Sequence, residues 1–343
     1  MTAEEGAAPP REQGWSGPIV AVILLLIVPT VSLIRIVVPI ENALLLLAPV
    51  TAACAVAGWK AGGRFPLALL WSAFAVWVVW SASGAPGSYL DLIRGWSVLL
   101  ALSFGAALAL PAVEGFLAKG LLALGVALLA GTAVLLMVPG GPGGAVDLVT
   151  AEIGRRAIVA TREWQQMTST PEWLEMVRQS PSWGRYSEGV DRQLIELPAP
   201  ALRLYPALFA LQSLAVMALG WAVYHRVGRT RLGPPLAKLR DLRFNDALVW
   251  GVVAGLVLVA VPASGAASVV GINLLVFFGV LYALRGMGVI IWFLAPGRAM
   301  TVAFAIFTVI FWPVVGMVAA GLGLGDTWFD WRRRTRQESQ RSE

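Results

Sequence analysis

Three polar residues lie in stretches of this chain that are otherwise almost wholly apolar, and their types suit the binding of a small molecule. Asn273 lies in VVGINLLVFF, Arg285 in YALRGMGVI and Asp326 in GLGLGDTWF. A charge at the centre of a membrane helix costs about 2.5–3.5 kcal/mol on insertion scales, so its presence needs a reason. Together the three side chains offer donors and acceptors for a polar solute. We therefore predict Asn273, Arg285 and Asp326 as substrate-binding residues.

The same residues also have structural interpretations. Asn273 can hydrogen-bond between helices, which is an ordinary packing device in membranes. Arg285 is followed by Gly286 and Gly288 and is expected to face the interior of a helix bundle, where an acid or backbone carbonyls can pair with it. For Arg285 the structural and the functional interpretation carry equal weight, because deep charges are functional by default.

The sequence GLGLGDTWFDWRRR ends the last apolar stretch and offers a second type of chemistry. Asp326 and Asp330 are four residues apart and can pair with nearby arginines at helical spacing. Aromatic residues beside arginines are typical of a membrane interface, so anchoring is one interpretation. The other is a docking site for a partner protein, formed by Asp330, Arg332, Arg333 and Arg334.

Most catalytic chemistry is unsupported by the sequence. The phosphate-binding pattern GxxxxGK[ST] and the hydrolase patterns HExxH and GxSxG do not occur. Cys54 and His225 are the single residues of their types, which leaves no material for a cysteine metal cluster or a disulfide within the chain. We therefore expect no enzyme activity, no cofactor and no metal.

Composition indicates a membrane protein. Of the 343 residues 58% are hydrophobic and only 13% are charged, against about 25% charged in soluble domains. Mean hydropathy is +0.74. The bases behind the net charge of +6 lie between apolar runs. This position is expected for bases that orient a membrane protein, so we expect no nucleic-acid partner. The expected partner is the lipid bilayer.

The elements that must position these residues are apolar helices. A span needs about 20 apolar residues, and nine stretches qualify as candidates: 18–39, 43–59, 66–83, 90–110, 116–138, 202–224, 246–263, 267–295 and 300–324. The predicted fold is therefore all-α, a polytopic membrane bundle of about 8–9 transmembrane helices. Its predicted parts are a disordered tail (1–17), five spans (18–138), an extracytoplasmic helical cap (139–201), four spans (202–325) and a basic tail (326–343).

Bases set the expected orientation. With a cytoplasmic N-terminus the bases between candidate spans fall on the cytoplasmic side, among them Lys60, Arg64, Lys119 and the group between Arg226 and Arg243. Nine spans would place the arginines at 332–336 outside, against this rule. Eight spans would place them inside, but omitting the weak candidate 43–59 would invert every loop that follows it. We favour nine spans.

The interval 139–201 is the longest polar stretch. Gly140 to Gly144 are expected to form a hinge, and 147–168 has helical apolar spacing. Thr170-Pro171-Glu172 predicts a helix start, and Ser180-Pro181 a second. Trp164, Trp173 and Trp183 can anchor these helices at a membrane surface. The interval is interpreted as a packed cap, with a ligand lid as the alternative.

Three C-terminal stretches carry a family resemblance. LRDLRFNDALVW, INLLVFFGVLYALRGMGVIIWFL and GLGLGDTWFDWRRR resemble the signatures of YybS-like predicted membrane proteins, a bacterial family with a domain of unknown function. The resemblance covers roughly 235–334 and implies a multi-pass protein of the bacterial cytoplasmic (inner) membrane. The first six spans are also distantly similar to the substrate-binding S components of energy-coupling-factor transporters, which bind a small molecule and use a separate ATPase.

Two hypotheses about function follow. The first is a transport-related, S-component-like protein with a small solute between its spans and the 139–201 segment as a lid. The second is a non-transport envelope or assembly factor whose partners are membrane proteins bound by the cap and the basic tail.

Overall fold

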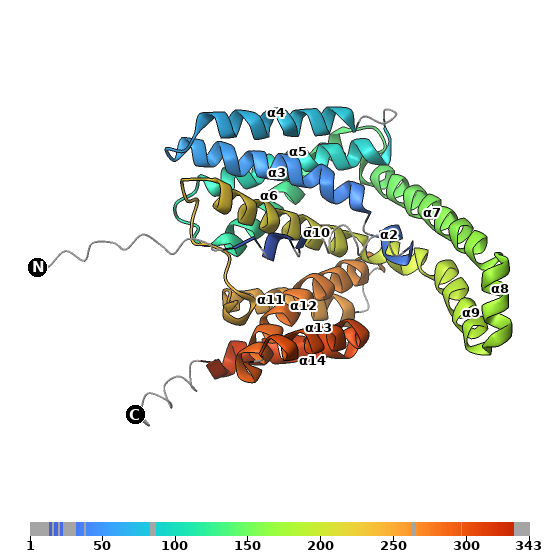
Figure 1. Ribbon diagram of the computed structural model, residues 1–343. Helices are drawn as coiled ribbons and strands as arrows, with labels where there is room; N and C mark the ends of the chain where they lie inside the picture. Colours follow the sequence, from blue (N-terminus) through green and yellow to red (C-terminus); the bar gives the residue numbers. More distant parts are fainter. Residues whose placement is uncertain are drawn as a thin grey trace, which may run out of the picture. The chain divides into compact units, whose positions relative to one another are not determined.

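The computed structural model describes residues 14–15, 17–19, 21–22, 32–37, 39–82, 87–261, 265–295 and 297–332. Nearly all of these residues are helical, and none of them forms a β-strand (Figure 1). The chain divides into two compact units, an N-terminal unit (Met1–Leu236) and a C-terminal unit (Ala237–Glu343). The all-α prediction is confirmed for the described part of the chain. Most of the first predicted span, 18–39, lies outside it.

Five described helices are long and apolar enough to cross a membrane, which confirms a membrane-embedded protein. They are α3 (Ile40–Lys60), α5 (Tyr89–Leu108), α6 (Phe116–Met137), α10 (Pro198–Val227) and α12 (Gly265–Leu294). Two shorter apolar helices, α4 (Phe65–Ser81) and α11 (Val249–Ala260), fall below that length. The structure therefore supports five candidate spans, and the predicted count of 8–9 is not established by it.

Helix α3 is the centre of the N-terminal unit, and α4, α5 and α10 pack against it. Gly220 of α10 lies against Val50 and Thr51 of α3, so closely that a β-carbon at position 220 would be 2.8 Å from Val50 Cγ1. Small residues at such crossings let helix backbones approach each other in lipid. Cys54 is buried on α3, as a free thiol.

Lys119 has a different role from the one its sequence position indicates. The sequence predicts that it helps to orient the chain in the membrane, but it is only 5% exposed. Its Nζ donates to the carbonyl oxygens of Ala107, Leu108 and Leu110 at 3.3, 3.2 and 3.1 Å. The last carbonyls of a helix lack partners within the helix, so Lys119 caps the C-terminus of α5.

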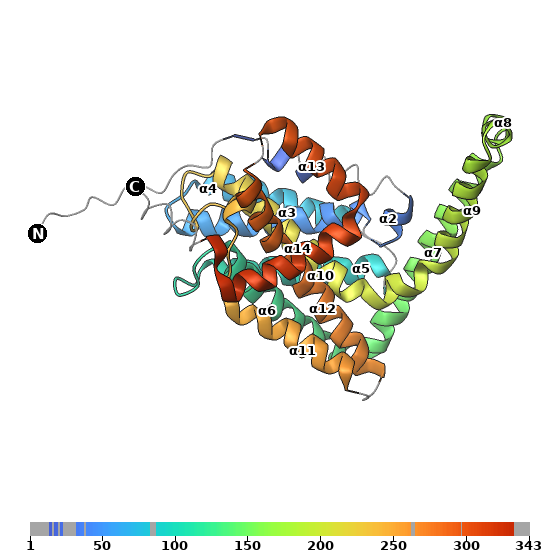
Figure 2. The same cartoon turned by 90° about the horizontal axis from the view of Figure 1, so that it is seen from below.

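The polar interval forms a projecting arm made of α7 (Gly141–Thr168), α8 (Pro171–Gln179) and α9 (Pro181–Glu196), as Figures 1 and 2 show. The two predicted helix starts are confirmed: α8 begins at Pro171, with the Thr170 hydroxyl accepting from the Trp173 amide, and α9 begins at Pro181. The chain turns at Gly140, in the left-handed region, and α7 already starts at Gly141.

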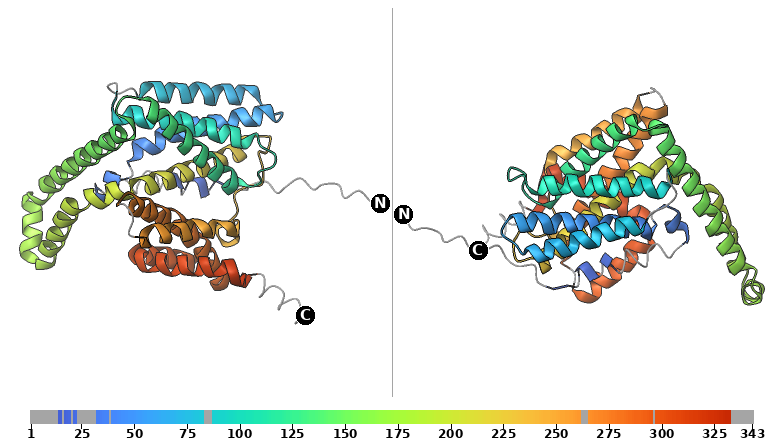
Figure 3. Two further views of the ribbon diagram at one scale, coloured as in Figure 1. Left: turned by 180° about the vertical axis from the view of Figure 1, so that it is seen from behind. Right: turned by 90° about the horizontal axis from the view of Figure 1, so that it is seen from above.

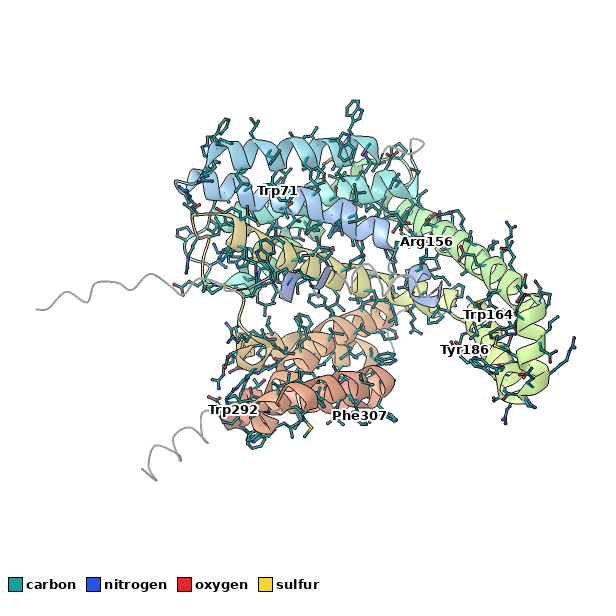
Figure 4. The ribbon with its side chains drawn as sticks, in the orientation of Figure 1. Trp71, Arg156, Trp164, Tyr186, Trp292 and Phe307 are labelled. Carbon is teal, nitrogen blue, oxygen red and sulfur yellow. The ribbon has the colours of Figure 1, made fainter. Side chains whose placement is uncertain are left out.

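The root of the arm packs on its own unit, while its far end is held by aromatic rings. Trp164, Trp173, Trp183 and Tyr186 form a closed ring of edge-to-face contacts, with centroids 5.6–6.2 Å apart. Figure 4 places Trp164 and Tyr186 far along the arm and Arg156 near its root. The view from behind in Figure 3 shows the same separation of the arm from the bundle.

In the C-terminal unit the predicted last span, 300–324, is not one helix. It is interrupted at Phe311, which separates α13 (Arg298–Ile310) from α14 (Trp312–Phe329). Trp-Pro follows the break, and proline favours the first turn of a new helix. Trp292 of α12 and Phe307 of α13 lie at opposite ends of this unit (Figure 4), so the chain crosses back through α13 and returns through α14.

The break in the predicted last span changes the expected side of the C-terminus. Nine unbroken spans placed Arg332 on the side opposite the basic loop that contains Arg240. In the structure Arg332 donates to the carbonyl oxygens of Arg240 (3.0 Å) and Leu242 (3.2 and 3.3 Å). Both segments therefore lie at the same end of the C-terminal unit, which corrects that expectation and removes its conflict with the positive-inside rule.

Candidate functional site

Two of the predicted substrate-binding residues meet in the C-terminal unit. Arg285 Nε donates to Asp326 Oδ2 at 3.0 Å, and Arg285 Nη2 donates to the Asp326 carbonyl oxygen at 3.2 Å. Arg285 Nη1 donates to Asp246 Oδ1 at 2.8 Å. The guanidinium also lies over the Phe244 ring, 5.3 Å from its centroid. All three nitrogens of the guanidinium are therefore engaged within the chain.

A second arginine shares the same carboxylate. Arg332 Nη2 donates to Asp326 Oδ2 at 2.7 Å, in addition to the loop carbonyls that this side chain binds. We call Arg285, Asp326 and Arg332 the Asp326 cluster. The side chains of these residues are 5%, 0% and 2% exposed. The charges are paired within the chain, although the buried atoms Asp326 Oδ1 and Arg332 Nε have no hydrogen-bond partner among the described residues. A solute would have to displace the existing pairs.

Close backbone packing holds the Asp326 cluster. A β-carbon on Gly286 would overlap the carbonyl oxygen of Ala319, and one on Gly323 would overlap the carbonyl oxygen of Tyr282. Helices α12 and α14 therefore touch backbone to backbone, one residue from Arg285 and three from Asp326. Only glycine allows this approach, and it brings the arginine within reach of the carboxylate.

The remaining predicted residues lie elsewhere. Asn273 donates from Nδ2 to Val269 O at 2.8 Å within its own helix, and twelve residues of α12 separate it from Arg285, about 18 Å along the axis. Asp330 pairs with Arg243 at 2.8 Å on an exposed surface. Arg332, a predicted docking residue, is buried. Arg333 and Arg334 lie outside the described residues.

A cavity that the sequence did not predict lies at the root of the arm, within the N-terminal unit. It measures about 390 Å³ and is lined by α7, by α2 (Ser32–Val37) and by the first turns of α3 and α5. We call it the arm-root cavity. Its charged lining residues comprise three arginines and three glutamates: Arg35, Arg155, Arg156, Glu41, Glu152 and Glu163.

Glu152 organises one wall of the arm-root cavity. Its carboxylate accepts from Arg155 Nε and Nη2 at 2.8 and 2.6 Å, and from Arg156 Nε at 2.8 Å. The spacing of three and four residues puts all three side chains on one face of α7. Burial raises the pKa of Glu152, but the hydrogen bonds and charges of Arg155 and Arg156 outweigh it, so this pKa is below its usual value of 4.5. The carboxylate is therefore ionised at neutral pH.

The other side of the arm-root cavity has the neutral polar residues Asn42 and Tyr89, and Tyr205 lies behind them outside the cavity lining. Asn42 Nδ2 donates to Tyr89 Oη at 2.6 Å, and Tyr89 Oη and Tyr205 Oη are 2.9 Å apart. Arg156 bridges the two sides, since its guanidinium lies 4.8 Å from the Tyr89 ring centroid. Asn42 is only 3% exposed and Tyr205 8%, so these groups are fixed before any ligand arrives.

Arg35 and Glu163 form a weaker contact beside the arm-root cavity. Their nearest charged atoms are 3.8 Å apart, and each side chain is about half exposed. An exposed pair at this distance contributes little stability. It joins α2 to the arm.

Sequence patterns contained partial signals of the arm-root cavity. The charges of EIGRR lie on one face of a helix with apolar spacing, and Glu41-Asn42 begins an apolar stretch. No local pattern brings residues near 42, 89, 156 and 205 together, because they are held by contacts between distant helices. Among the described residues, no group of three or more His, Cys, Asp or Glu side chains could hold a metal ion.

Part of the sequence matches a family model. Residues 169–327, a little under half of the chain, match the family model described as "Predicted membrane protein (DUF2232)". This supports the predicted resemblance to a membrane family of unknown function, and it spans α8 to α14. It supports neither the YybS-like name nor the similarity to S components. No curated protein matches the chain, and no solved structure does.

Proposed function

We propose that this membrane protein binds a small polar solute in the arm-root cavity, as a transport-related protein of the S-component-like type. The observation that carries the proposal is the cavity of about 390 Å³ bounded by six charged side chains from α2, α3 and α7. Ligand cavities measure about 300–1,000 Å³ and use a few fixed polar groups to orient the ligand. The proposal includes no catalytic step.

The lining of the arm-root cavity favours a solute with both charges. Arginines and glutamates are equal in number there, so a free anion or a free cation would meet repulsion as well as attraction. Arg155 is the accessible donor, since its side chain is 64% exposed while it remains paired with Glu152. Asn42 and Tyr89 add neutral polar groups to the lining. An amino acid or a similar zwitterion carries both charges and can pair with arginines and glutamates at once.

The arm acts as the lid in this proposal. Its helix α7 supplies Glu152, Arg155, Arg156 and Glu163, while α2 and the bundle supply the opposite wall. The Arg35–Glu163 contact and the contacts of Arg156 with Ile36 O and the Tyr89 ring break when the lid opens. The Glu152 pairs stay intact because all their members belong to α7. Helix α7 belongs to the predicted cap, 139–201, and this proposal gives it the role of a lid.

In this proposal the Asp326 cluster is structural. Its charges are satisfied within the C-terminal unit, so it joins the loop at 240–246 to α12 and α14. We further propose a bacterial cytoplasmic membrane location with the C-terminus on the cytoplasmic side, because Arg332 lies beside the basic loop.

A binding screen on the purified protein tests the solute site. Thermal unfolding in detergent is followed with amino acids, water-soluble vitamins and dicarboxylates, and a ligand at 100 times its Kd should stabilise by about 2.7 kcal/mol. Arg156→Gln should abolish the shift. Arg178→Gln is the matched control, since Arg178 is on α8 of the same arm, 75% exposed and outside the cavity. A stabilising ligand whose shift survives Arg156→Gln would overturn this site.

The exposed far end of the arm favours a second candidate function. Trp183 and Tyr186 are 43% and 55% exposed there, and exposed aromatic groups of this kind mark protein or membrane contacts. An envelope or assembly factor would use this surface for partner proteins. A mild-detergent pull-down separates the two: an ATPase pair with a coupling subunit supports transport, and cell-wall, division or secretion proteins alone support assembly.

A further inference from the structure

A second cavity lies among α3, α4 and α5 of the N-terminal unit, and the arm-root proposal does not use it. Helices α4 and α5 both pack on α3, and between them they leave a groove of about 890 Å³. We call it the α3–α5 groove. Its walls are mostly apolar and include several small side chains, among them Ala53, Ala57, Ala101 and Gly105.

The length of the α3–α5 groove matches a lipid chain. On α5 its lining runs from Arg94 to Ala109, which is about 22 Å at 1.5 Å per residue. One leaflet of the hydrocarbon core is about 15 Å deep. The groove therefore takes an acyl chain over the full depth of one leaflet. Small side chains on the walls leave room for such a chain.

Charge distinguishes the two ends of the groove. Lys60 and Arg231 line it at the end where α3 finishes, and Lys60 is exposed. Arg94, at the other end, is already paired with Asp91 at 3.0 Å. An anion is therefore attracted to the Lys60 end. Basic groups beside apolar surfaces between membrane helices recognise anionic lipid headgroups.

We propose that the α3–α5 groove is a binding site for an anionic phospholipid, with its phosphate at the exposed Lys60 and an acyl chain between α4 and α5. The site is independent of the solute site at the arm root. The proposed ligand is a lipid, because a free phosphate would occupy only the basic end and would leave the apolar walls without a ligand.

The test measures lipid retained by the purified full-length protein in native mass spectrometry. The protein is exchanged into nanodiscs with equal amounts of phosphatidylglycerol and phosphatidylcholine carrying the same acyl chains, then released. We expect phosphatidylglycerol to be retained preferentially. Lys60→Gln should reduce that preference roughly fivefold, the effect of one basic residue near an anionic headgroup. Arg64→Gln, at the N-cap of α4 and outside the groove, should leave it unchanged.

A steric variant tests the acyl-chain half of the site. Ala57→Phe fills the groove one turn from Lys60 and should abolish retention of either lipid there, whereas Ala73→Phe is the control on an exposed face of α4 outside the groove. Equal retention of the two lipids, or equal losses in Lys60→Gln and Arg64→Gln, overturns the proposal. Unchanged retention in Ala57→Phe overturns it as well. If Ala57→Phe does not fold, the comparison of Lys60→Gln with Arg64→Gln is the deciding test.

Discussion

The Asp326 cluster and the wall of the arm-root cavity are built alike and differ in what surrounds them. In each, one carboxylate accepts hydrogen bonds from two arginines: Asp326 from Arg285 and Arg332, and Glu152 from Arg155 and Arg156. The first carboxylate is 0% exposed and the second 15%, with Arg155 at 64%. A similar ion-pair motif can therefore join helices in one place and line an open cavity in another.

Their sequence spacing explains the difference. Glu152 and its arginines are three and four residues apart on one helix, so they form without any tertiary contact. Asp326 and Arg285 are 41 residues apart and come from two helices, while Arg332 adds the carbonyls of a loop. Local pairs can stay at a surface and serve a ligand, whereas pairs between distant segments commit those segments to each other.

The largest effect is expected from Asp326→Asn. The neutral amide leaves Arg285 and Arg332 buried without their shared charge, and breaking a buried pair in this way costs about 3–5 kcal/mol. Thermal unfolding in detergent, together with the yield of monodisperse protein, measures the loss. A change below 1 kcal/mol would mean that the cluster is not what holds the C-terminal unit together.

The next effect is expected from Gly286→Ala. The added methyl group meets the Ala319 backbone, so α12 and α14 must separate, and overpacking of this kind costs about 1–3 kcal/mol. Gly279→Ala on the same helix is the matched control, because a β-carbon there meets nothing within 4 Å. The same unfolding assay applies. Equal effects at both positions would contradict a glycine-dependent contact.

A smaller and pH-dependent effect is expected from Glu152→Gln. Since the folded pKa of Glu152 is below its usual 4.5, ionised Glu152 stabilises the fold above that pH, and this contribution is lost as pH falls through the folded value. The variant should lose about 1 kcal/mol at pH 7, and the difference from the native protein should shrink below pH 4.5. Unfolding curves between pH 7 and pH 3.5 measure it, and a difference that grows on acidification would reverse the assigned sign.

The smallest effect is expected from Asp330→Asn. The Arg243–Asp330 pair is exposed, and such pairs contribute about 0–1 kcal/mol. Asparagine also tolerates the left-handed conformation that residue 330 adopts, with φ of 40°. Unfolding should therefore be nearly unchanged. A loss as large as that of Asp326→Asn would place the important contacts of the tail at the surface and not in the Asp326 cluster.

The sequence by itself determined the class of protein and much of the local structure. Long apolar stretches and a low share of charged residues indicate a membrane protein. The spans are helical because the backbone in lipid has no water to bond with, and a helix satisfies its backbone hydrogen bonds internally. The helix starts at Pro171 and Pro181 follow from capping chemistry, which acts within a few residues. The sequence also singled out Arg285 and Asp326 as unusual, since a charge in an apolar stretch is costly wherever it lies.

Only the tertiary structure decided what those charges contact and where a cavity lies. Arg285 finds Asp326 because two glycines let α12 and α14 touch, and Asn42, Tyr89 and Tyr205 meet because three distant helices converge at the root of the arm. The break at Phe311 also returned the chain to the end where Arg332 binds the loop. Residue spacing fixes what shares a helix face, whereas contacts between helices depend on packing across the whole unit, which local patterns do not encode.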